Sequence, residues 1–383
     1  MSQAFVKVQA TSMTSAMQTS TPIPTIADEL ERLGAGYLLA DLLPNGTSTS
    51  DSIAPTPIGA SESSALVTLC QNNRLAPILG DAVHTGQLIL ADQAMPELAT
   101  SIEHYLASQL RVECAGMAVI DTLIRNGVDF RMLKGMATAH LDYPNPAMRP
   151  TGDLDILVQP KDIPAVIESL SKLEGGDFQV LPGNDWRVTH ALPFRLSGIE
   201  IDVHNRLLHQ AAGHSAARLD LFADPAHYEI AGRRVRALPP WLRLLQAASQ
   251  NVIGGSPKLS SDLDVARLAG HETNAISRAR EVGLGWVVAE GIRRSQQALA
   301  WGHPGAVPAL AGWRDRAFER TYGRGTTSVQ AAAVLEFTVA PMALRAALTR
   351  SAVLPGRAYL ENRGRSPGEQ VLRQIKRIGR SRR

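Results

Sequence analysis

The stretch Asp153-Leu154-Asp155-Ile156-Leu157-Val158 decides the fold, because it is typical of an apolar strand that carries two carboxylates two residues apart. Side chains at positions i and i+2 of a strand point to one face of its sheet. The aliphatic side chains at the alternate positions therefore pack into a core, while Asp153 and Asp155 project together from the opposite face. Carboxylates this close repel each other unless a cation lies between them, and the simplest such cation is a divalent metal ion.

A second strand is predicted at Ile199-Glu200-Ile201-Asp202-Val203-His204, where apolar and polar residues alternate without interruption. If it lies beside the first strand, Asp202 joins Asp153 and Asp155, and the three carboxylates form a site for one or two Mg²⁺ or Mn²⁺ ions. Such sites serve phosphoryl or nucleotidyl transfer, in which metal ions hold the attacking and leaving oxygens at phosphorus. His204 is open to two interpretations, a group that contacts the substrate or Asp202, or a structural histidine.

The segment upstream of the first carboxylate supplies groups suited to a triphosphate. Lys134-Gly135 lies at a predicted strand-to-helix turn, where a residue without Cβ lets phosphate oxygens approach the backbone amides and the helix N-terminus favours anions. The Lys134 ammonium adds a full positive charge. Arg149, four residues before Asp153, is a candidate for a bidentate phosphate contact.

The periodicity of apolar residues predicts an α+β fold, a small mixed sheet flanked by N-terminal helices and a helical C-terminal half. We expect strands over residues 128–133, 153–158, 178–181, 187–196 and 199–204. Downstream of the first strand we expect helices over 135–141, 162–173, 241–252, 259–269, 275–282 and 286–299.

Composition and periodicity divide the chain into five parts. The predicted parts are a mostly disordered Ser/Thr/Pro-rich tail (1–63), an N-terminal helical segment (64–127), the α/β core (128–238), a C-terminal helical domain (239–345) and a basic tail (346–383). From Arg345 to the end, eleven Lys and Arg oppose two Glu, a net charge of +9, which leaves −6 on the rest of the chain. The tail is either a solvated terminus or a contact for nucleic acid, anionic lipid or an acidic partner.

The bulk composition of the 383 residues, 44% hydrophobic and 20% charged, is that of a globular protein able to bury a core. Cys70 and Cys114 are too few for a disulfide framework or a cysteine-based zinc site. We expect a cytoplasmic protein without a membrane span, since the chain has neither a signal-peptide pattern near its start nor an apolar run of about 18 residues.

Other patterns have structural explanations. The chain has no GxxxxGK[ST] loop and no GxGxxG after a strand, which argues against P-loop and Rossmann nucleotide sites. Asp262-Leu263-Asp264 repeats the Asp-x-Asp pattern, but its surroundings have helical spacing, and residues i and i+2 of a helix diverge. We interpret Asp262 as a helix cap and dipole partner. Glu200 is expected to face solvent, His190 has the same two interpretations as His204, and Trp241, Trp286 and Trp301 are expected in the core.

At these motifs the chain resembles the uncharacterised nucleotidyltransferase family of the DNA polymerase β-like superfamily. The resemblance covers roughly residues 66–345, and it rests on Leu133-Lys134-Gly135, on the segment from Arg149 to Asp155 and on Ile201-Asp202-Val203-His204. It implies that Asp153, Asp155 and Asp202 are metal ligands and catalytic residues, with Asp202 helping to activate an acceptor hydroxyl. The usual Gly-Ser of the superfamily is replaced here by Gly135-Met136.

These observations lead to one principal hypothesis. It is a Mg²⁺-dependent nucleotidyltransferase that moves NMP from an NTP to a hydroxyl of a small molecule, peptide or RNA and releases pyrophosphate. Lys134, Gly135, Arg149 and His204 would bind the substrate. The alternative, motivated by the missing serine, is a catalytically inactive protein of the same fold that binds a nucleotide or partner. A third possibility is an RNA-directed enzyme or toxin that uses the basic tail.

Overall fold

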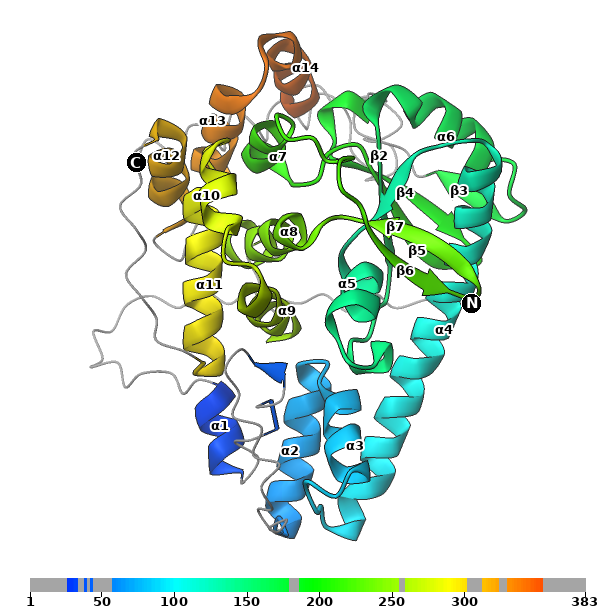
Figure 1. Ribbon diagram of the computed structural model, residues 1–383, viewed down its shortest axis with the longest axis vertical. Helices are drawn as coiled ribbons and strands as arrows, with labels where there is room; N and C mark the ends of the chain where they lie inside the picture. The colour runs from blue at the N-terminus through cyan, green and yellow to red at the C-terminus, as the bar shows by residue number, and fades with distance from the viewer. Residues whose placement is uncertain are drawn as a thin grey trace.

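The computed structural model describes residues 26–33, 38–39, 42–43, 57–178, 186–254, 259–301, 312–323 and 329–353. In these residues helices surround a mixed β-sheet (Figure 1), which confirms the predicted α+β class. The α-helices are α1 (Ile26–Arg32), α2 (Ala60–Asn72), α3 (Ala76–His84), α4 (Met95–Arg125), α5 (Lys134–Asp142), α6 (Ile163–Leu170), α7 (Gln210–Ala216), α8 (Pro240–Ile253), α9 (Leu259–His271), α10 (Ala275–Arg280), α11 (Gly285–Leu299), α12 (Trp313–Tyr322), α13 (Val329–Val339) and α14 (Met342–Val353). The strands are β1 (Phe130–Met132), β2 (Leu154–Val158), β3 (Gly176–Phe178), β4 (Ala191–Leu196), β5 (Ile199–His204), β6 (Ala226–Ile230) and β7 (Arg233–Ala237).

The sheet has seven strands in the order β3-β4-β5-β2-β1-β7-β6. β2 pairs with β5 in parallel, and β1 pairs with β7 in parallel, whereas the other neighbours are antiparallel. The two carboxylate-bearing strands, β2 and β5, are therefore direct neighbours in the middle of the sheet. The tight turn between β4 and β5 uses Ser197 and Gly198, which both have positive φ angles of 51° and 80°.

The two faces of the sheet are covered by different layers. Alternate residues of β2 and β5, such as Ile156 and Val203, are buried with apolar side chains of α4 and α6. On the opposite face Leu157 packs with α7, α8 and α11 in a second apolar cluster that includes Trp241 and Trp286. The alternation in sequence thus separates a fully apolar face from one that also carries carboxylates.

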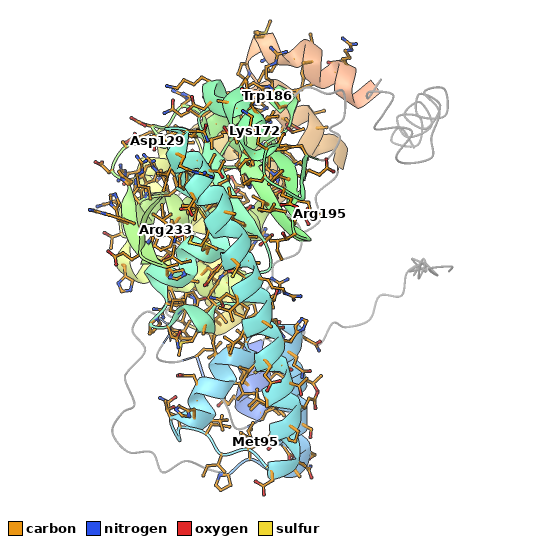
Figure 2. The ribbon with its side chains drawn as sticks, turned by 90° about the vertical axis from the view of Figure 1, so that its right-hand side faces the viewer. Met95, Asp129, Lys172, Trp186, Arg195 and Arg233 are labelled. Atoms are coloured by element: carbon orange, nitrogen blue, oxygen red, sulfur yellow. The ribbon has the colours of Figure 1, made fainter. Side chains whose placement is uncertain are left out.

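Helix α4 connects the N-terminal helices to the sheet. With 31 residues it is about 46 Å long, and Figure 2 shows it running from Met95 toward Asp129, which follows its last turn. Leu98 near its start packs with α2 and α3, whereas Val119 and Leu123 near its end pack under the sheet. No helix in the described ranges has both the length and the apolarity needed to cross a bilayer.

The N-terminal helices also contact the helical C-terminal half. Leu30 of α1 and Leu66 of α2 share a buried cluster with Leu263 of α9, Leu299 of α11 and Trp301. The segments 64–127 and 239–345, which are far apart in the chain, therefore build one apolar interior. The predicted burial of Trp241, Trp286 and Trp301 is confirmed.

The hairpin of β6 and β7 was not among the predicted elements. Tyr228 and Val235 are buried and their immediate neighbours are less buried, so the alternation is present, but Arg233, on the same face as Val235, interrupts the apolar half of the pattern. Ala231 and Gly232 form the turn with positive φ angles of 46° and 72°. This hairpin occupies one edge of the sheet, as Arg233 shows in Figure 2, and β7 extends the sheet beyond β1.

Several predicted boundaries also shift. β2 begins at Leu154, so Asp153 precedes the strand, and a 3₁₀ turn, Trp186–Val188, replaces the start of the strand predicted over 187–196. The third strand lies at Gly176–Phe178, and residues 179–181 of the predicted strand are outside the described ranges. Most of the predicted tail 1–63 and all of 354–383 also lie outside them.

Helix α9 contains a buried carboxyl group, Asp262, that makes the stability of the fold depend on pH. Asp262 accepts a hydrogen bond from Asn251 Nδ2 of α8 at 2.7 Å, and burial raises the pKa of Asp262 to about 7. In the unfolded chain an Asp titrates at about 3.9, so between about pH 4 and 7 the folded state retains a proton that the unfolded state has lost. This carboxyl therefore lowers stability as pH rises through that window.

We expect Asp262→Asn to remove the loss of stability that occurs as pH rises from about 4 to 7. Asparagine still accepts from Asn251 and has no charge to desolvate, so the variant should be more stable than the parent at pH 8, on the order of a few kcal/mol, and nearly equal at pH 4. Urea unfolding at both pH values measures the difference. Asp177→Asn, an exposed position of β3, controls for the loss of one negative charge. An equal stability change at both pH values would contradict the assignment.

Candidate functional site

Asp155 and Asp202 lie side by side on neighbouring parallel strands. The register of β2 and β5 pairs Asp155 with Asp202 and Leu157 with His204. Because adjacent strands are about 4.8 Å apart, side chains at paired positions on one face reach the same small region. The predicted neighbourhood of the two strands is confirmed, and it gathers two of the three predicted carboxylates.

Asp155 is buried and pairs with two basic groups. Lys134 Nζ lies 2.5 Å from Asp155 Oδ1, and His204 Nε2 lies 2.7 Å from the same oxygen. Burial alone would raise the pKa of Asp155, but the Lys134 ammonium and the His204 ring outweigh it and hold this pKa well below its usual range. Asp155 is therefore a carboxylate at any physiological pH, and Lys134 occupies the place of its counter-ion.

Asp202 is half-buried beside this pair. Burial and the negative charge of Asp155 raise the pKa of Asp202 above its ordinary value. One ligand atom each of Asp155, Asp202 and His204 lies within 4.8 Å of the other two. Two carboxylate oxygens and one imidazole nitrogen at this spacing form a donor set that Mg²⁺ or, with its higher affinity for nitrogen, Mn²⁺ can use.

Asp153 lies outside this three-residue group. It precedes β2, and its side chain is exposed, although the surrounding protein atoms still desolvate it in part. This desolvation and the charge of Asp155 raise the pKa of Asp153, against the opposing charges of Lys134 and Arg149. The structure thus places Asp153 near Asp155 but not among the gathered ligand atoms.

The Lys134-Gly135 turn has an unusual backbone. Lys134 has a φ angle of +44°, which is uncommon for a residue with a side chain, and its amide nitrogen lies 3.3 Å from Gln246 Oε1. A Cβ on Gly135 would lie 2.7 Å from Thr151 Oγ1 and 3.1 Å from Arg149 Nη1. In this structure glycine is thus required by close packing against the loop before β2, whereas the sequence analysis attributed it to phosphate binding.

Arg149 points to a different partner from the one we predicted. Its Nε and Nη2 donate to the two carboxylate oxygens of Asp264 at 3.1 and 2.6 Å, and Tyr143 donates its hydroxyl to Asp264 at 2.9 Å. The charge of Asp264 outweighs the desolvation of the guanidinium and raises the pKa of Arg149. Arg149 therefore joins the loop after α5 to α9, and Asp264, the second carboxylate of Asp262-Leu263-Asp264, has a structural role.

Two further histidines border the carboxylates. The rings of His190 and His209 have centroids 3.8 Å apart, and His190 lies 5.3 Å from the ring of His204. Burial, with the neighbouring histidines and Lys134, lowers the pKa of His190 to about 2 and that of His209 to about 4. Both rings are neutral at physiological pH. The role of His190 was left open by the sequence, and His209 was not predicted; both residues lie just before a regular element, His190 before β4 and His209 before α7.

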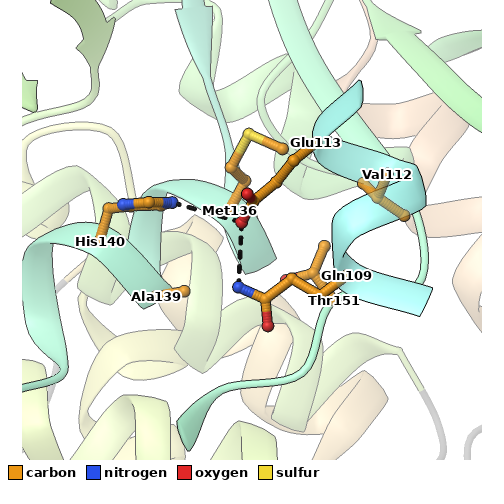
Figure 3. A pocket seen from close by; sticks show the side chains of 7 residues that line it. All are labelled: Gln109, Val112, Glu113, Met136, Ala139, His140 and Thr151. Atoms are coloured by element: carbon orange, nitrogen blue, oxygen red, sulfur yellow. Dashed lines mark hydrogen bonds and ion pairs between the residues drawn. The ribbon is translucent and has the colours of Figure 1, made fainter. Parts of the chain in front are cut away.

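A closed contact between α4 and α5 supports the turn that carries Lys134. Figure 3 shows Glu113 between Gln109, whose Nε2 donates at 3.0 Å, and His140, whose Nε2 lies 3.7 Å away. The interaction with His140 holds the pKa of Glu113 below its usual range. The His140 ring also stacks on Tyr228 with centroids 5.0 Å apart. Since the contact leaves no space for a water molecule, it stabilises α5 rather than binding a ligand.

Comparison with known proteins identifies a family and a similar structure. The model of a family described as uncharacterised nucleotidyltransferase matches residues 59–300, which include all the site residues above. The crystal structure of an antigenic nucleotidyltransferase-like protein from Paracoccidioides brasiliensis is similar over 50% of this chain and 94% of that chain, with 15% identity and a TM-score of 0.34. No curated protein matches the chain.

Proposed function

Because the chain belongs to this uncharacterised nucleotidyltransferase family, we propose that it transfers NMP from an NTP to an acceptor hydroxyl with the help of a divalent metal ion. The observation that carries the proposal is the register of β2 and β5, which sets Asp155 and Asp202 side by side with Lys134 next to them. Carboxylates in this arrangement suit a metal ion, and the ammonium suits a triphosphate.

The residues fit a divalent ion. Asp155, Asp202 and His204 would hold it, and the exposed Asp153, which lies near Asp155, would supply a further carboxylate. A bound ion supplies charge stabilisation for the oxygens of the transferred phosphoryl group. His204 directs Nε2 at Asp155, so it either donates a hydrogen bond to this carboxylate or offers its lone pair to a cation. The imidazole nitrogen supports Mn²⁺ as well as Mg²⁺.

Lys134 and Asp202 have separate roles in this proposal. Lys134 extends from the strand-to-helix turn to Asp155, so its ammonium can neutralise triphosphate oxygens held at the same turn. Asp202, next to Asp155 on the neighbouring strand, would accept the proton of the acceptor hydroxyl. The His190 and His209 rings near His204 are neutral and add no positive charge there.

For Arg149 and Gly135 we propose positioning roles. Arg149 anchors the loop before β2 to Asp264, and Gly135 packs closely against Thr151 of that loop. Together they hold the Lys134 turn next to the carboxylates. A phosphate contact by Arg149 would require its pair with Asp264 to break.

Release of pyrophosphate from NTPs tests the proposal. Nucleotides labelled at the α-phosphorus distinguish nucleotidyl transfer, which releases unlabelled pyrophosphate, from transfer of the γ-phosphoryl group. We expect metal-dependent release, with peptides and hydroxylated small molecules added as acceptors, and a loss of at least about a hundredfold in Asp202→Asn, since general-base catalysis contributes 10²–10⁴-fold. Asp177→Asn is the matched control. Pyrophosphate release that Asp202→Asn leaves unchanged would refute the role of Asp202.

The alternative, an inactive nucleotide- or partner-binding protein, is favoured by one observation. The turn has Met136 where the superfamily usually has serine, and Gly135 is covered by Thr151. This alternative predicts that nucleotide binds without any release of pyrophosphate. Equilibrium binding of a non-hydrolysable NTP, measured next to the release assay, separates the two functions. The salt dependence of RNA affinity tests separately whether RNA is the acceptor.

A further inference from the structure

A cavity of about 510 Å³ lies beyond the carboxyl ends of β2 and β5. Leu157, which lines it, follows Asp155 by two residues on β2 and so lies on the same sheet face, while Arg206 belongs to the segment directly after β5. Trp186, labelled in Figure 2, forms part of its wall close to α14. None of the carboxylates of the proposed transfer site lines it. It is therefore a separate compartment next to that site.

The walls of this cavity are mainly apolar. They come from four places in the chain: the end of β2, the residues around Trp186, the segments that follow β5 and α7, and the start of α14. The apolar wall residues are Leu157, Val158, Pro160, Trp186, Leu207, Ala217, Leu219, Leu221, Phe222, Pro341 and Leu344. A volume of this size is typical of sites for small organic ligands.

Two arginines line this apolar space, the half-buried Arg206 and the exposed Arg187. Arg206 Nη1 lies 3.1 Å from both ring nitrogens of His214, and its Nε is buried without a hydrogen-bond partner among the described residues. Burial lowers the pKa of Arg206, and Glu336, 3.7 Å from His214, only partly opposes this. Asp220 also lines the cavity, but its carboxylate accepts from the backbone amides of Phe222 and Ala223.

We propose that this cavity binds a small amphipathic anion. A carboxylate or phosphate of the ligand pairs with the guanidinium of Arg206, and its hydrocarbon part packs against the apolar walls. The anion supplies a full negative charge at the guanidinium, where Glu336 opposes the effect of burial only in part and Nε has no hydrogen-bond partner among the described residues. The proposal does not depend on nucleotidyl transfer, since it involves none of Asp155, Asp202 or Lys134.

Calorimetric titration with ten-carbon amphiphiles tests this proposal. The probes are decanoate, decyl phosphate and decyltrimethylammonium, each below its critical micelle concentration. We expect one or both anions to bind and the cation not to bind. The preferred anion shows whether the natural ligand carries a carboxylate or a phosphate. If neither anion binds, or if the cation binds more tightly than the anions, the proposal is overturned.

Two variants locate the binding. Arg206→Gln removes the charge and should weaken anion binding about tenfold or more, since hydrogen bonds to charged groups contribute about 1.5–3 kcal/mol. Ala217→Trp, at an exposed position of the wall, should block the cavity without disturbing the core. Arg111→Gln, beside a separate groove along α4, is the matched control and should bind like the parent. If the affinity for the preferred anion is unchanged by both Arg206→Gln and Ala217→Trp, the assignment is refuted.

Discussion

Replacing Asp155 by Asn is expected to abolish nucleotide transfer, with a loss of at least about a thousandfold, or about 4 kcal/mol in the barrier. The substitution keeps the shape of the side chain but removes the charge that balances Lys134 and would hold a metal ion. Pyrophosphate release measures the rate. Mn²⁺ binding followed by electron paramagnetic resonance should weaken in parallel, and this readout does not depend on turnover.

The same substitution has a second, pH-dependent consequence. Because the folded-state pKa of Asp155 is lowered, its carboxylate contributes stability above the unfolded pKa of about 3.9, and this stability is lost as pH falls through the folded pKa. Asp155→Asn should therefore be less stable than the parent at pH 7, with a smaller difference near pH 3. If the variant is folded, binds Mn²⁺ like the parent and transfers nucleotide at the parental rate, Asp155 is not part of the transfer site.

The second large effect is expected at Arg149. Arg149→Met leaves the buried Asp264 with the Tyr143 hydroxyl as its hydrogen-bond donor among the described residues, and breaking a buried ion pair on one side costs about 3–5 kcal/mol. Urea unfolding should show a loss of this size. Adding Asp264→Leu should recover part of it, because the double variant no longer buries an unpaired charge.

An exposed pair of the same geometry provides the control. Arg233 also donates through Nε and Nη2 to both oxygens of an aspartate, Asp121, at 2.6 and 2.7 Å, but both side chains are more than a third exposed. Arg233→Met should cost at most about 1 kcal/mol. If Arg149→Met instead leaves stability unchanged and raises only the KM for NTP, Arg149 is a phosphate ligand, as its position before Asp153 first indicated.

The strands that carry the site could be predicted because their signal is local. The alternation of apolar residues in β2 and β5 fixes which side chains share a face, and the apolar half of that pattern is the buried layer under α4 and α6. That the two strands are neighbours was a condition of the prediction, since alternation does not fix the strand order. The ion pair of Lys134 with Asp155 was not predicted, because a positive φ angle at a lysine has no sequence signature.

The partners of Arg149 and Gly135 could not be predicted in the same way. Arg149 and Asp264 lie 115 positions apart, and Asp264 is on a helix whose spacing explained its charge without a long-range partner. A glycine at position 135 can serve either to let a phosphate approach the backbone or to allow close packing of another side chain. The position of Thr151, which is known only from the structure, distinguishes these two explanations. Contacts of this kind depend on how elements pack, which local periodicity does not contain.

The parallel pairing of β1 with β7 has a consequence for biosynthesis. Met132 pairs with Ala237, so a ribosome must synthesise the whole carboxylate region and the hairpin beyond it before β1 acquires its second neighbour. Until then the outer edge of the three-residue strand β1 has unpaired amides and carbonyls, which are templates for intermolecular association. Sequence-distant pairings of this type also slow folding. Production of the chain should therefore benefit from low temperature or from chaperones that shield the edge of β1.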